Sequence, residues 1–176
     1  MIRSSLMSLA LLLGLTSVGC GPDVEGGPGS FAASQKMQQS AEEFLKSKGA
    51  TLSREHFPPG DAWVINLSDK EVTDETFQKL LELDHVARLN LSGTAVTDAQ
   101  MKLLNDPEIG GLLVELDISK TGITDAGLKE FTIAKFLSKL SIAGSKITDA
   151  GLKAWQTDRR ANGSIQGSFK NPKITK

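Results

Sequence analysis

The sequence predicts an α/β protein in which about four strand-and-helix units stack into a solenoid, with a parallel sheet on one side and helices on the other. A phrase made of Val or Ile followed by Thr-Asp occurs four times, at residues 72–74, 96–98, 123–125 and 147–149. The successive aspartates are 24, 27 and 24 residues apart. Apolar residues two positions apart precede each phrase, as in a strand with one buried face, and a helical pattern follows each phrase.

Residues 1–19 are expected to form a signal peptide that is removed on export. Arg3 precedes a run rich in leucine that extends to Val18 and contains no acidic residue. The run has about thirteen residues, fewer than the roughly 20 that a helix needs to cross a bilayer. A retained membrane span is therefore the weaker interpretation.

The only cysteine, Cys20, follows this run directly in Ser17-Val18-Gly19-Cys20. This junction resembles a bacterial lipobox, although Ser17 stands where that motif usually has leucine. The resemblance implies that Cys20 becomes the acylated first residue, for example with palmitate, of an exported lipoprotein of a bacterial cell envelope, facing the periplasm or held at the outer membrane. The alternative is an ordinary secretory signal with an incidental cysteine. Residues 20–33 contain several glycines and prolines and are expected to form a flexible tether.

Residues 34–61 are expected to cap the amino-terminal end of the solenoid. Apolar side chains fall at helical spacing between about residues 34 and 48, and Gly49 ends the pattern. A short strand at 50–53 and a proline turn at 57–61 follow, and Trp63 is expected to cover the core rather than to hold a ligand. The apolar residues of this predicted helix are Met37, Ala41, Phe44 and Leu45.

Residues 62–157 contain the repeats. Each strand delivers Thr and Asp to the start of a helix, where either side chain can accept hydrogen bonds from free backbone N–H groups. We interpret the four aspartates as structural caps rather than as calcium ligands, because one carboxylate per repeat is too few for a calcium site. These aspartates are Asp74, Asp98, Asp125 and Asp149. The extra three residues of the longest repeat fall in a predicted loop at 105–111.

The repeats resemble the cysteine-containing class of leucine-rich repeats, in a bacterial variant that ends in Ile-Thr-Asp-Ala-Gly-Leu. The resemblance implies that a polar side chain after each strand ties the turn to the backbone of the next repeat. The matching residues are Lys70, Thr94, Thr121 and Ser145, of which Lys70 has no hydroxyl. The resemblance also implies a protein partner, and it indicates no particular activity.

Residues 158–176 are expected to form a carboxy-terminal cap and a basic tail. A turn at 162–163 precedes Ser164, Ile165, Gln166 and Phe169, which are expected to add a final edge strand. Two interpretations of the basic residues stay open: a soluble edge that resists pairing with another sheet, and a weak patch for anionic lipids or wall polymers. These residues are Arg159, Arg160, Lys170, Lys173 and Lys176.

The outward face of the sheet is the candidate surface for a partner, because equivalent residues of parallel strands stack about 4.8 Å apart. Its charges are mixed, with Glu115 between Arg88 and Lys139, and the whole chain has a formal net charge of -1. A protein, or a glycan, therefore fits this face better than a polyanion, and nucleic acid is not expected. The candidate residues are Arg88, Asn90, Ser92, Glu115, Asp117, Ser119, Lys139 and Ser141.

No constellation in the sequence points to catalysis, to a metal or to a cofactor. His56 and His85 stand apart from each other, and neither belongs to a cluster of His, Cys or acidic residues. The sequence thus predicts a non-catalytic cell-envelope lipoprotein whose repeat surface binds another protein in that envelope. The alternatives are a structural spacer without a specific ligand and a glycan or cell-wall binding module.

Overall fold

The computed structural model describes residues 28–58, 60–107, 109–161 and 173–176. The predicted signal peptide, Cys20 and the first part of the predicted tether lie outside these residues. No helix in the described ranges has the length and hydropathy that a membrane crossing requires.

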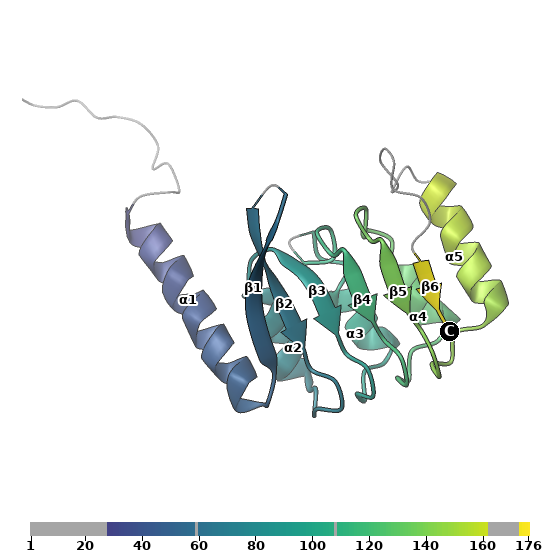
Figure 1. The fold of residues 1–176 in the computed structure, drawn as a ribbon, viewed down its shortest axis with the longest axis horizontal. Helices are drawn as coiled ribbons and strands as arrows, with labels where there is room; N and C mark the ends of the chain where they lie inside the picture. Colours follow the sequence, from purple (N-terminus) through teal and green to yellow (C-terminus); the bar gives the residue numbers. More distant parts are fainter. Residues whose placement is uncertain (1–27, 59, 108, 162–172) are drawn as a thin grey trace, which may run out of the picture.

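A single six-stranded sheet with the strands in sequence order forms one side of the molecule (Figure 1). The first strand is antiparallel to the second, and every later pair is parallel. Equivalent apolar residues are in register across the parallel strands, so that Leu89 pairs with Ile65 on one side and with Leu116 on the other. The strands are β1 Thr51–Phe57, β2 Gly60–Asn66, β3 Val86–Asn90, β4 Glu115–Asp117, β5 Lys139–Ser141 and β6 Lys173–Thr175.

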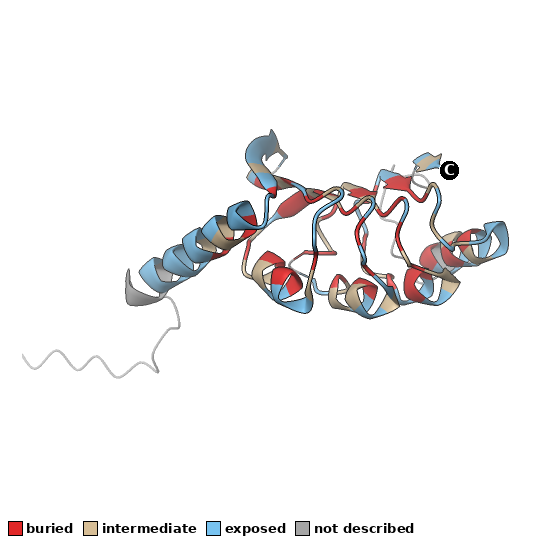
Figure 2. Cartoon of the chain, turned by 90° about the horizontal axis from the view of Figure 1, so that it is seen from below, coloured by how far each residue is buried: buried red, intermediate tan, exposed pale blue. Residues whose placement is uncertain are grey.

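Helices follow strands β2 to β5 in turn and cover the other side of the molecule (Figure 2). These helices are α2 Asp74–Leu81, α3 Asp98–Leu103, α4 Asp125–Glu130 and α5 Asp149–Ala161. Helix α1, Pro28–Ser47, precedes the sheet and lies beside β1 at the amino-terminal end. The predicted solenoid, with its parallel sheet on one side and its helices on the other, is confirmed.

The core is one continuous apolar layer between the sheet and the helices. Leu89, Leu116 and Leu140 enter it from the strands and are at most 2% exposed. Phe77 and Leu128 enter it from the helices and are fully buried. Each fully buried side chain of this size contributes about 1.5 to 3 kcal/mol before conformational entropy is subtracted, so stacking the coils is what makes each of them stable.

The turns after β3, β4 and β5 are each closed within their own coil by a side-chain hydroxyl, which corrects the expectation taken from the repeat class. The hydroxyl of Thr94 donates to the carbonyl oxygen of Leu91 at 2.6 Å, and that of Thr121 to the carbonyl of Ile118 at 2.7 Å. Ser145 does the same three residues after its acceptor. In these three turns the hydroxyl therefore reaches back along the chain to a carbonyl three residues earlier.

Both ends of the solenoid differ in detail from the prediction. Helix α1 begins at Pro28, six residues before the expected start, and so includes the last part of the predicted tether. Proline suits a first helical position, because its missing N–H would have no partner there. Strand β1 continues to Phe57, beyond the expected 50–53.

At the carboxy-terminal end, the strand that pairs with β5 is β6, which consists of residues expected to belong to the basic tail. The strand expected at 164–169 lies outside the described residues. Arg159 is 2% exposed and does not belong to an exposed basic patch. It donates to the carbonyl oxygen of Ala134, and its guanidinium lies 4.6 Å from the centre of the Trp155 ring.

Candidate binding surface

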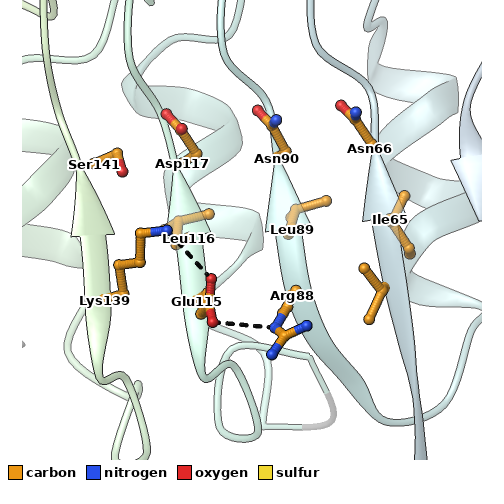
Figure 3. Close-up of a pocket in the computed structure, with 11 residues that line it drawn as sticks. Ile65, Asn66, Arg88, Leu89, Asn90, Glu115, Leu116, Asp117, Lys139 and Ser141 are labelled. Carbon is orange, nitrogen blue, oxygen red and sulfur yellow. Dashed lines mark ion pairs between the residues drawn. The ribbon is translucent and has the colours of Figure 1, made fainter. Parts of the chain in front are cut away.

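A row of alternating charges crosses the open face of the sheet from β1 to β5. Arg88 Nη1 donates to Glu55 Oε2 at 2.7 Å, and Arg88 Nε lies 3.1 Å from Glu115 Oε1 without hydrogen-bond alignment. Lys139 Nζ is 3.6 Å from the other oxygen of Glu115 (Figure 3). Each charge in the row thus faces an opposite charge, as the sequence predicted for the last three members. Glu55 was missed because the predicted first strand was too short.

A second row consists of side chains that hold the turns after the strands. Oδ1 of Asn66, of Asn90 and of Asp117 each accepts a hydrogen bond of 2.9 Å from the backbone N–H two residues later. The bond fixes the orientation of each side chain, so the remaining amide or carboxylate group of each residue is held in place on the open face. Figure 3 shows the three side chains in line, with Ser141 on the next strand.

The two rows, apart from Glu55, line a shallow groove of about 250 Å³ on the sheet. Six of the eight predicted residues line it, and they come from three different strands. Ser92 and Ser119 do not, because their backbone N–H groups bond to Asn90 and Asp117 and their side chains lie in the turns. The lining residues are Val64, Ile65, Asn66, Arg88, Leu89, Asn90, Glu115, Leu116, Asp117, Lys139 and Ser141.

Three of the four repeated aspartates are not the N-caps of their helices, which corrects the prediction for Asp74, Asp98 and Asp125. The N-cap of α2 is Thr73, that of α3 is Thr97 and that of α4 is Thr124. Each of these three aspartates is the first residue of its helix, and its carboxylate accepts hydrogen bonds from a residue of the next coil instead. The prediction failed because the sequence cannot tell an aspartate that bonds within its helix from one that bonds to a residue about 25 positions away.

These carboxylates form an aspartate ladder, made of Asp74, Asp98 and Asp125 with their partners in the following coil. Asp98 accepts from Thr124 N at 2.8 Å and from Thr124 Oγ1 at 2.7 Å. Asp125 accepts from the same two atoms of Thr148, and these bonds lower the pKa of the Asp125 carboxyl below its ordinary value of 3.8. Asp74 accepts instead from Gln100 Nε2 at 2.6 Å.

The glycine of each Asp-Ala-Gly makes room for this ladder. A Cβ at Gly127 would lie 2.2 Å from Asp98 Oδ1, and one at Gly151 would lie 2.0 Å from Asp125 Cγ. Gln100 occupies the equivalent position in the second coil, where it donates to Asp74. Asp149 belongs to the last coil that the structure describes, and Lys176 is its ion-pair partner.

The two histidines lie apart, and each has one acidic neighbour. His56 Nδ1 is 3.0 Å from Asp61 Oδ1, and both side chains are exposed. His85 Nδ1 is 3.7 Å from Asp84 Oδ2. In the described part of the chain, no three or more His, Cys, Asp or Glu side chains are placed to hold a metal ion together.

A leucine-rich-repeat family model matches residues 112–131 and 134–154, which span β4, α4, β5 and the start of α5. These two coils are leucine-rich repeats. The match covers the region where strand register, closed turn and aspartate ladder are most regular. A search of curated proteins gave no significant match to the chain. Leucine-rich repeats generally mediate protein–protein interaction and are typically non-catalytic.

Proposed function

We propose that this protein is a non-catalytic interaction module that binds a protein partner in the cell envelope on the open face of its sheet. The groove lined by Arg88, Asn90, Glu115, Asp117, Lys139 and Ser141 is the observation that carries the proposal. Asn90 and Asp117 are held by hydrogen bonds to the turns, and Arg88 is held by ion pairs, before any partner arrives. This reduces the entropy that binding must overcome.

The charge row favours a protein over a polyanion. Glu115 is shared by Arg88 and Lys139, and Glu55 takes the other side of the Arg88 guanidinium. Charges matched in this way create little field at a distance, so they select a partner by local complementarity and not by long-range attraction. The fixed amides of Asn66 and Asn90 add hydrogen-bonding groups that a folded protein surface can meet.

A swap of the central ion pair tests the proposal. In Arg88→Glu with Glu115→Arg the two residues of the pair still attract each other, but the alternation of charges is lost. The new acid at position 88 faces Glu55, and the new base at position 115 faces Lys139. We expect the full-length chain to lose a partner captured by chemical crosslinking from envelope extract, while its unfolding temperature stays within a few degrees. Capture of the same partner by the swapped variant would refute the proposed surface and would favour binding on another face.

We further propose that acylated Cys20 anchors the module to a membrane. The support is the sequence Ser17-Val18-Gly19-Cys20 after an apolar run, followed by glycines and prolines. Growth of expressing cells with a clickable palmitate analogue is expected to label the protein, and Cys20→Ser is expected to abolish the label. Label that persists in Cys20→Ser would refute the anchor without touching the proposed binding face.

A further inference from the structure

A second cleft lies at the amino-terminal end, between α1 and β1, away from the open face of the sheet. The two elements meet at the tight turn around Gly49, where the backbone N–H of Ala50 donates to the carbonyl oxygen of Leu45. From that turn they diverge, so that the amino-terminal part of α1 extends away from the body (Figures 1 and 2). Ala41 and Leu45 are fully buried, whereas almost every residue between 32 and 40 is exposed.

The cleft has a volume of about 570 Å³, within the range of roughly 300 to 1,000 Å³ that ligand clefts occupy. Its lining from α1 is one helix face of polar residues at spacings of three and four. The lining residues are Gln35, Gln38, Gln39 and Glu42 of α1, Leu52, Ser53 and Arg54 of β1, and Trp63 of β2.

A buried donor at this cleft has no acceptor. Trp63 is 6% exposed, and its indole Nε1 finds no hydrogen-bond partner within the described structure. The other tryptophan is satisfied, because Trp155 Nε1 donates to the carbonyl oxygen of Phe131 at 2.7 Å. An unpaired buried N–H is costly, so the cleft favours an occupant that brings an acceptor.

The cleft also opens on the backbone edge of β1. Successive side chains of a strand point to opposite faces, so a cavity lined by three consecutive residues, here 52 to 54, reaches the edge itself. Among the described strands, β1 is the first of the sheet and pairs on one side only, with β2. Free backbone N–H and C=O groups on such an edge are a template for another strand.

The charges at the cleft are already matched. Glu42 accepts from Lys46 at 2.6 Å, and Arg54 donates to Asp84 at 3.1 Å while its guanidinium covers the Trp63 ring. The groups left over are the indole N–H, the strand edge and the glutamine amides. Amides donate and accept, as the peptide backbone does, so this set matches an uncharged extended chain better than an anion.

We propose that the cleft binds an extended, uncharged segment of a partner protein, which adds a strand to the free edge of β1. One acceptor of the segment takes the hydrogen of Trp63 Nε1, and Gln35, Gln38 and Gln39 bond to its backbone from the side of α1. In this mode of recognition, hydrogen bonds to the main chain of the segment provide affinity, and contacts with its side chains provide specificity.

The probe for this cleft is a library of random linear peptides of about seven residues, the length of β1, selected on the immobilised full-length chain. Recovered peptides are expected to shift the indole ¹H–¹⁵N signal of Trp63 and to leave that of Trp155 in place. Trp63→Phe and Gln38→Ala are each expected to weaken binding roughly three- to tenfold, as the loss of one hydrogen bond predicts. Methylation of every second peptide nitrogen is expected to abolish binding, because it blocks strand pairing.

Two controls separate this cleft from the rest of the molecule. Lys36→Ala changes an exposed residue of α1 outside the cleft, and Lys153→Ala changes an exposed residue of α5 at the other end of the solenoid; both are expected to keep full affinity. The proposal is overturned if no peptide is enriched, or if Trp63→Phe and Gln38→Ala, each shown to be folded, bind as tightly as the parent chain. It is equally overturned if methylated peptides bind normally, or if a chitin trisaccharide moves the Trp63 signal and the peptides do not.

Discussion

Replacing Gly127 with alanine tests whether the aspartate ladder ties neighbouring coils together. The new Cβ would lie 2.2 Å from Asp98 Oδ1 and 2.9 Å from Asp98 Cα, and the backbone contact cannot be relieved by rotating a side chain. The carboxylate must therefore move away from Thr124, with which it makes bonds of 2.8 and 2.7 Å.

The magnitude follows from two opposing effects. Two hydrogen bonds to a charged group are worth about 1.5 kcal/mol each at the lower end of their range, which suits a partly exposed carboxylate. Alanine in place of glycine returns about 1 kcal/mol of helix propensity. The expected net loss is about 2 kcal/mol of unfolding free energy, or a fall of roughly 4 to 8 °C in Tm for a chain of this size.

The assay is thermal and urea unfolding followed by circular dichroism, and a double-mutant cycle with Asp98→Ala isolates the ladder. We expect Gly127→Ala to cost clearly less in the Asp98→Ala background, because no hydrogen bonds are left to lose. Ala126→Gly, one residue earlier in the same helix, measures the propensity effect alone. If Gly127→Ala is as stable as the parent chain, or costs the same with and without Asp98, the ladder does not hold the coils together.

Three further predictions concern single residues. Lys120 has a φ of 55°, a strained value for a residue with a side chain, in a turn position where two other coils have glycine. Lys120→Gly is therefore expected to raise the unfolding free energy by about 0.5 kcal/mol in urea unfolding. A lower midpoint of urea unfolding would contradict this backbone strain. The hydrogen bonds from Thr148 lower the pKa of Asp125, so the stability that they contribute is complete above pH 3.8 and is lost as the pH falls through the lower pKa of the folded state. Thr148→Val is expected to flatten this loss of stability in acid. An unchanged slope of stability against pH would argue against the role of these bonds. Arg159 is buried without a carboxylate partner among the described residues, and burial lowers the pKa of its guanidinium below its ordinary value. Arg159→Met is therefore expected to change the unfolding free energy by less than about 1 kcal/mol or to stabilise the protein, and a loss above about 3 kcal/mol would show a counter-charge that the described residues lack.

The candidate surface could be predicted largely from the sequence because it depends on alternation. Once Leu89, Leu116 and Leu140 face the core, the residues beside them must face outward, and parallel register brings Arg88, Glu115 and Lys139 into one row. Ser92 and Ser119 were placed on the same surface by the same alternation. Ser92 and Ser119 do not line the groove, because the strands end at Asn90 and Asp117 and the chain turns after them.

The N-terminal cleft could not be predicted in this way. The sequence placed Trp63 against the core, and the structure agrees, but the state of its indole N–H depends on the angle between α1 and β1. That angle is set at Gly49 and by the packing of Ala41 and Leu45, which no local pattern records. A polar helix face at residues 35 to 42 was the only signal in the sequence, and by itself it is typical of any solvated helix.

By itself, the sequence determined the coils: strand, turn and helix in a repeat of 24 to 27 residues, with their leucines stacked in a single core. Periods of this kind are local, because each side chain's direction follows from its place in a strand or helix. Tertiary structure alone decided what the polar groups do, such as Asp98 bonding to the next coil, Arg159 being buried and β6 closing the sheet. Those outcomes depend on which polar atoms of residues far apart in the sequence come within hydrogen-bond distance of each other. A repeated sequence phrase does not determine that distance.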